Sequence, residues 1–412
     1  MPFYNRRSLL LAMGLLALAL RTANSAEITV PKLELASRGW VSDGEFAVSS
    51  RLSADLALSG GYKYSFLMGF SLEAPDLARA FAYRDFNFSP LPGGATVDVA
   101  EYNDLVDHVN DRLNNQAYIG LRVAKATVRE LFGLPLELSY FAGADNSFCT
   151  GEEISSRYGL PPFGSDFGGF FYFPEGIGGS PGRRYDGIYG VRGTGFSLSL
   201  TKWAFVTPMA YLYYDFASHG NYYSAGSLYS GDLRVLFCRN WLRMEVFGGI
   251  SFNKSLDTEL RGGLMAHFSG KGVAFFAQAG IPGFIWGEKF SIDNLFFLFE
   301  PRLQYGLFGM HISFFYHPVV YCHIITPEER GKANVNLKFL IGKAELGPAG
   351  GIELGAGIKI NGINEDFDFL VSPFFSFLSG GLRWDTKVRV RPLEFKTPEK
   401  IVDFFIGVRT AF

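Results

Sequence analysis

Basic side chains recur on one row of the alternating segments of this 412-residue chain. Successive side chains of a β-strand point to opposite faces, so residues two apart share a face. This rule places on one polar row Arg51, Lys63, Arg122, Arg243, Glu245, Arg261, Lys338, Arg383, Lys387, Arg389 and Arg409. The same row includes Arg234 and Arg391, with a smaller acidic set of Asp55, Asp232, Asp385 and Asp403. Rings of Arg and Lys favour anions where they line a pore. An equal interpretation is that these charges pair and lock a protein wall.

Catalytic and metal-binding patterns do not stand out in the sequence. The six His residues do not have metal-ligand spacings, and no G-x-S-x-G nucleophile elbow is evident. The Gly193-Thr194-Gly195 stretch lies in a strand-like run rather than before a helix, which argues against a phosphate-binding loop. We therefore expect no enzyme activity, no cofactor and no metal.

The elements that must position the polar row are short alternating runs separated by turn residues. In the run from Phe46 to Leu58, Val48 and Leu52 alternate with Ser49 and Arg51. Ser59-Gly60-Gly61 then turns the chain into an aromatic row from Tyr62 to Phe70, which predicts a hairpin. Later runs repeat this pattern, each near the ~10 residues that a tilted membrane strand needs.

The first 26 residues predict a cleaved secretory signal peptide. Arg6 and Arg7 precede an apolar run from Leu9 to Leu20, and small residues follow up to Ala26. The run is shorter than the ~20 residues of a membrane-spanning helix. Residues 27–412 are then one exported domain, and we expect export through the signal peptide to end in an outer membrane.

Composition supports a chain whose surface meets lipid. Aromatic residues make up 16% and charged residues only 19% of the sequence, whereas soluble domains average about 25% charged. The net charge of -2 gives no indication of nucleic acid as a partner. Three cysteines, Cys149, Cys238 and Cys322, are too few for a disulfide framework, and which of them pair is left open.

The C-terminal stretch from Ile401 to Phe412 has one mostly apolar row: Phe404, Ile406, Val408, Thr410 and Phe412. The opposite row carries Asp403 and Arg409. A chain that ends on an aromatic residue after such a strand resembles the assembly signal of bacterial outer-membrane β-barrels, with Phe404, Ile406, Val408 and Phe412 as its signal residues. The resemblance is to a class and implies outer-membrane lipid and the barrel assembly machinery as partners.

A closed barrel follows because a strand in lipid must pair all of its backbone polar groups, and closure removes both sheet edges. We predict an all-β, transmembrane, antiparallel up-and-down barrel of about 16–18 strands, within a range of about 14 to 18. Tight joints are expected at 59–61, 239–240, 269–272 and 379–381. Long loops are expected at about 73–116, 143–185, 281–293, 318–331 and 393–400. This alternation matches short periplasmic turns and long external loops.

Two long insertions interrupt the strands. In the first, Asp98 and Glu101 could cap a short amphipathic helix with Val99, Tyr102, Val106, Val109 and Leu113 at helical spacing. That helix could plug the lumen, lie over its mouth or, as the favoured interpretation, pack on its own loop. The second insertion is rich in Gly and aromatics, and its candidate apolar contacts are Phe163, Phe170, Phe171, Tyr172 and Phe173. These aromatics could form a lumen constriction, meet a lipid surface or bind an apolar ligand. An external loop folded on itself is the favoured interpretation there.

The leading functional hypothesis is a channel for passive passage of small solutes, with a preference for anions. One alternative resembles the outer-membrane long-chain fatty acid transporters, because of the Phe-rich loops and many apolar inward positions. Residues 27–40 show nothing like the Asn-Pro-Ala motif of the N-terminal hatch of that family. Further alternatives are a surface adhesin barrel, a barrel enzyme with scattered catalytic residues and a secreted soluble β-protein. The solute and the oligomeric state are left open.

Overall fold

The computed structural model describes residues 26–42, 45–74, 118–165, 187–200, 205–215, 228–252, 258–316, 332–343, 347–359, 367–394, 396–397 and 401–410. Residues 1–25 of the predicted signal peptide, the helix predicted after Asp98 and the aromatics Phe170, Phe171, Tyr172, Phe173 and Phe412 lie outside these ranges, as does Cys322. Within them, no helix is both long and apolar enough to cross a bilayer.

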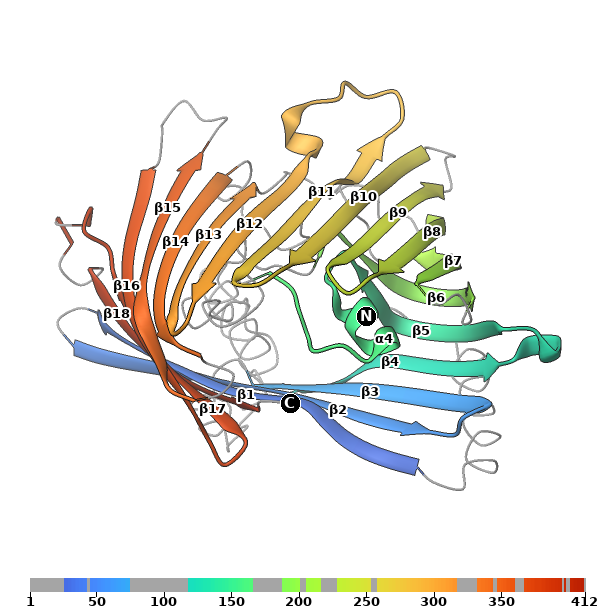
Figure 1. Ribbon diagram of the computed structural model, residues 1–412, viewed down its shortest axis with the longest axis horizontal. Coiled ribbons are helices and arrows are strands. Elements are labelled where there is room, and N and C mark those ends of the chain that lie inside the picture. Colours follow the sequence, from blue (N-terminus) through green and yellow to red (C-terminus); the bar gives the residue numbers. More distant parts are fainter. Residues whose placement is uncertain are drawn as a thin grey trace, which may run out of the picture.

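Eighteen antiparallel strands form one sheet, within the predicted range. They are β1 Ala26–Ser42, β2 Glu45–Gly60, β3 Tyr64–Ala74, β4 Tyr118–Arg129, β5 Leu136–Phe148, β6 Tyr189–Leu200, β7 Val206–Asp215, β8 Leu228–Cys238, β9 Leu242–Phe252, β10 Thr258–Ser269, β11 Val273–Ile285, β12 Phe296–Tyr305, β13 Phe308–Tyr316, β14 Lys332–Gly342, β15 Ala349–Lys359, β16 Phe367–Ser379, β17 Leu382–Val390 and β18 Val402–Thr410. Each strand pairs with its neighbours in sequence, and β1 also pairs with β18. The sheet is therefore a closed up-and-down barrel (Figure 1).

The short and long connections alternate as predicted. Tight turns join β2 to β3, β8 to β9, β10 to β11 and β16 to β17, and the long connections follow β3, β5, β11, β13 and β17. Both ends of the strand series, Ala26 and Thr410, lie at the end with the tight turns. Strand β1 starts at Ala26, and its first two residues pair with Gly60 and Ser59 at the end of β2.

The outer face of the barrel is apolar. On β8, Leu233 and Val235 are exposed while Asp232 and Arg234 on the alternate row are buried. On β18, Phe404 and Ile406 are exposed while Asp403 and Phe405 are buried, as the alternation of the C-terminal stretch predicts. In a closed sheet, an exposed apolar row faces lipid, and the opposite row faces the lumen.

An aromatic belt marks each end of the lipid-facing surface. At the end with the tight turns, exposed aromatics include Tyr62, Phe132, Trp241, Tyr305 and Phe308. At the opposite end are Phe46, Tyr229, Phe297 and Phe367. Such paired girdles sit at the two membrane–water interfaces of outer-membrane barrels.

Leu233 lies at the middle of β8 on the lipid face and is 67% exposed. We expect Leu233→Arg to lower the free energy of unfolding by about 2–4 kcal/mol, the cost of an Arg at the bilayer midplane. Urea unfolding in lipid vesicles would measure the loss, with Leu233→Ala as the uncharged control. An equal effect of Arg and Ala would contradict a membrane-buried position.

Candidate functional site

The candidate site is the lumen, and its main feature is the chain that follows β5. Residues 149–165, the inward segment, contain the helix α4 Glu152–Tyr158 and lie inside the ring of strands (Figure 1). Ile154 of α4 is fully buried. The interpretation of this insertion as an external loop folded on itself is wrong for these residues. They pack instead on the inner face of the barrel wall.

A β-bulge directs the chain inward. The register of β5 against β6 shifts between Ala144 and Asn146, next to Gly143 with a φ of 105°. A Cβ at Gly143 would lie 2.2 Å from the Arg122 carbonyl oxygen, so only glycine fits. The shift reverses the alternation, and Phe148 therefore enters the lumen fully buried.

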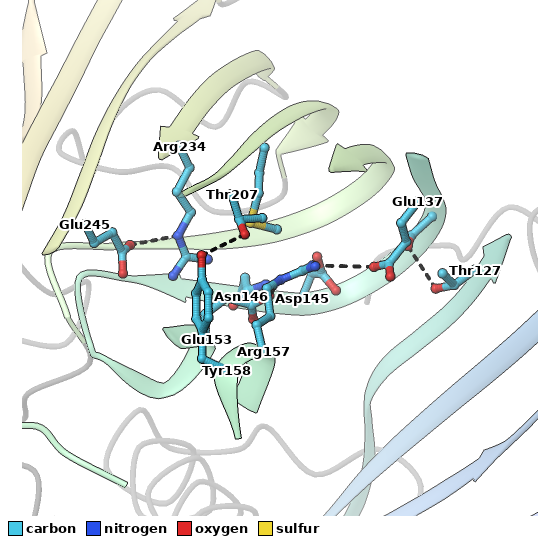
Figure 2. Close-up of polar contacts among 12 residues, drawn as sticks. Thr127, Glu137, Asp145, Asn146, Glu153, Arg157, Tyr158, Thr207, Arg234 and Glu245 are labelled. Atoms are coloured by element: carbon cyan, nitrogen blue, oxygen red, sulfur yellow. Dashed lines mark hydrogen bonds and ion pairs between the residues drawn. The ribbon is translucent and has the colours of Figure 1, made fainter. Parts of the chain in front are cut away.

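Side chains of α4 bind to the barrel wall (Figure 2). Arg157 pairs with Glu153 one turn earlier and with Glu137 of β5 at 3.4 Å, and the Tyr158 hydroxyl lies 3.0 Å from the Thr207 hydroxyl of β7. Burial alone would raise the pKa of the Glu153 carboxyl, but Arg234, Arg157 and Lys125 together lower that pKa to about 2. The carboxylate thus stays ionised at neutral pH. Its pairing stabilises the fold above its ordinary pKa and is lost only as pH falls towards about 2.

The half of the lumen behind the inward segment is a packed core. Seventeen of the described residues form one buried hydrophobic cluster inside the barrel, among them Phe148, Tyr211, Phe247, Phe276 and Phe315. Phe148 packs on Tyr211 and Phe247 with ring centroids 5.3 and 5.0 Å apart. The cluster also contains Cys149, and burial raises the pKa of its thiol well above the ordinary value. Cys238, which packs against the cluster, is a free cysteine.

Buried ion pairs link the strands in this half. Arg261 of β10 binds Asp232 of β8 through two guanidinium nitrogens at 2.6 and 3.0 Å, and Tyr213 donates to the same carboxylate at 2.8 Å. Arg234 binds Glu245 of β9 at 2.8 Å, and both side chains are fully buried. These charges act as parts of the wall.

The other half of the lumen carries a more accessible basic wall. Arg409 of β18 binds Asp385 of β17 at 2.9 Å, and Lys387 binds Glu353 at 2.8 Å. Asp403 contacts three guanidinium groups: Arg391 at 2.6 Å, Arg38 at 2.9 Å and Arg389 at 4.0 Å. Asp403 is thus a common partner of three guanidinium groups on this wall.

The predicted row is distributed between these two halves. The core half contains Arg243, Glu245 and Arg261. The basic half contains Arg51, Lys338, Arg383, Lys387, Arg389 and Arg409. Arg122 of β4 pairs with Asp55 of β2, across β3, at 3.6 Å. The prediction that Lys63 lies on the polar row is wrong, because Lys63 is exposed in the turn between β2 and β3 rather than on the wall. The strand ends there, so alternation no longer applies.

Several wall residues were not predicted from the sequence. In β12, Glu300 and Arg302 lie on the row opposite Phe297 and Phe299. In β1, Arg38 lies two residues before Trp40, on the same row. The alternation of side chains along these strands could have identified Glu300, Arg302 and Arg38 as wall residues. Asp145 lies in the bulge and pairs with Lys125 at a distance of 2.9 Å. Alternation is interrupted at the bulge, so it gives no signal for Asp145.

The closed 18-stranded sheet, its lipid-facing belt and its polar inner row define an outer-membrane, porin-like β-barrel. No family model and no curated protein matches the sequence. Among solved structures, the chain is similar to OpdL of Pseudomonas aeruginosa, with a TM-score of 0.51 and 11% identity over 93% of this chain and 98% of that one. It is also similar to OccK8 (OprE) of Pseudomonas aeruginosa, with a TM-score of 0.51 and 10% identity over 94% and 98%. At these identities the likeness establishes the fold.

Within the described ranges, no three His, Cys, Asp or Glu side chains are grouped to hold a metal ion. The prediction that the chain is not an enzyme stays a prediction.

Proposed function

We propose that this protein is an outer-membrane channel for passive passage of small solutes, with a preference for anions. The observation that carries the proposal is the basic wall around Asp403, where Arg38, Arg389 and Arg391 share one carboxylate. Fixed positive charge at a pore wall raises the local concentration of anions. Barrels of 16–18 strands are wide enough to leave an aqueous channel.

The test is the reversal potential of purified protein in a planar bilayer across a salt gradient. We expect an anion-selective channel, and the double variant Arg38→Gln/Arg391→Gln to move the reversal potential towards zero because two of the three guanidinium charges are lost. Arg239→Gln is the matched control, since Arg239 lies in the β8–β9 turn and stacks on Phe205 at 4.5 Å. Cation selectivity of the wild type would contradict the proposed preference, and absence of conductance would contradict the channel.

The alternative, a transporter of hydrophobic molecules, has less support. The luminal aromatics Phe148, Phe276, Phe296 and Phe315 are buried in one hydrophobic cluster, so they form a core rather than a surface for an apolar ligand. Binding of a fluorescent fatty acid with little conductance would favour that alternative. A surface adhesin role would rest on the aromatic loop residues after Ser165, which lie outside the described ranges.

A further inference from the structure

We propose that Glu245 and Glu300 are the positioning residues of the inward segment. They hold its two ends against the core half of the barrel, so that solutes pass only along the opposite half. The consequence for solute passage rests on the proposed channel function. The placement of the segment does not, and it can be tested separately.

Glu245 fixes the start of the segment. Its Oε1 atom accepts the Cys149 backbone N–H at 2.6 Å and also binds Arg234 at 2.8 Å. On the other side, Gln278 of β11 donates to the Cys149 carbonyl oxygen. Cys149 has a φ of 66°, a left-handed conformation that a non-glycine residue adopts only when its surroundings hold it there. The wall therefore determines the backbone at the point where the chain turns inward.

Glu300 of β12 fixes the other end. Its Oε2 atom accepts the Ser165 hydroxyl at 2.8 Å. Arg302, two residues along the same strand, binds Glu300 and donates to the Gly164 carbonyl oxygen. Between the two ends, Phe163 stacks on His267 with ring centroids 4.7 Å apart and lies 4.9 Å from the Arg243 guanidinium. The segment thus spans the wall from β9 to β12.

The open side of the segment borders the remaining space. A cavity of about 870 Å³ lies between Ser156 of α4 and the ends of β1 to β5 near the tight turns. Ser59, Ser65, Thr127 and Arg129 line it from the wall. The distance between α4 and this wall sets the width of the passage there, and that distance depends on the two carboxylates that hold the segment on the far side.

The experiment uses the double variant Glu245→Gln/Glu300→Gln of the full-length protein in lipid vesicles. The first measurement is trypsin cleavage after Arg157, located by mass spectrometry. We expect protection in the wild type, because trypsin is too large to enter the barrel, and cleavage in the variant as the segment leaves the lumen. The second measurement is the uptake rate of neutral sugars of increasing size, for which we expect a higher size limit in the variant.

Glu259→Gln is the matched control, because Glu259 is a buried carboxylate on β10 whose charged neighbours are Arg261 and Asp215. It should keep both the protection and the size limit. If the double variant does not fold, Ser165→Ala/Gln278→Ala removes one hydrogen bond at each end without leaving an unpaired charge, and should give the same changes to a smaller degree. A folded variant that stays protected at Arg157 overturns the proposal. Cleavage without any uptake, in wild type or variant, retains the positioning role and overturns the channel.

Discussion

Asp232→Ala is expected to lower the free energy of unfolding by about 3–5 kcal/mol, the cost of leaving one partner of a buried ion pair uncompensated. The side chains of Asp232 and Arg261 are 0% and 1% exposed. Once the carboxylate is removed, water therefore cannot reach the Arg261 guanidinium to solvate its charge. Tyr213 would also lose the acceptor of its hydroxyl group. Urea unfolding in lipid vesicles, followed by tryptophan fluorescence, measures the loss.

Two variants separate the buried charge from other effects. Asp385→Ala breaks a pair whose side chains are 16% and 26% exposed, and it should cost at most about 1 kcal/mol because water screens the remaining Arg409. Asp232→Leu/Arg261→Met replaces the whole pair with apolar side chains and should recover most of the lost stability. Equal losses for Asp232→Ala and Asp385→Ala would show that water reaches Arg261.

Removal of the inward segment is expected to raise the single-channel conductance several-fold. In this variant, residues 151–164 are replaced by a short Gly-Ser linker between Thr150 and Ser165. The segment lies inside the ring of strands, so its loss would open space between the cavity beside α4 and the wall from β9 to β12 (Figure 1). Planar-bilayer recording of the purified variant is the measurement.

The β11–β12 connection provides the control for this deletion. Its residues 286–295 are described, and Trp286, Phe290 and Ile292 are 70%, 49% and 49% exposed, so they do not fill the lumen. Replacing residues 287–294 by two glycines shortens a loop at the same end of the barrel and should leave the conductance unchanged. Equal conductance of the wild type and the 151–164 deletion would show that solutes do not pass beside α4.

Much of the fold could be predicted because its main signal is local. A strand repeats every two residues, so Leu233 and Asp232 reveal opposite faces from a few neighbouring letters. Glycine-containing turns such as Ser59-Gly60-Gly61 mark hairpins, and together with the alternating runs they limit the strand count to about 14 to 18. The requirement to pair every backbone group in lipid then leaves closure as the only outcome.

The site was only partly predictable. Alternation identified Arg261 and Asp232 as inward residues, but it could not say that they pair, because their pairing depends on the stagger of β8, β9 and β10. It failed at Lys63, where the strand ends, and it could not reach Phe148, where the bulge at Ala144–Asn146 reverses the faces.

The sequence by itself determined a closed barrel with an apolar exterior, a polar interior row and alternating short and long connections, since each of these follows from side-chain order over about ten residues. Only the tertiary structure decided that the chain after β5 turns inward and divides the lumen into a packed half and a basic half. The reason is that the groups holding it, Glu245, Gln278 and Glu300, come 96 to 135 residues later in the chain and meet Cys149 and Ser165 only when the barrel closes.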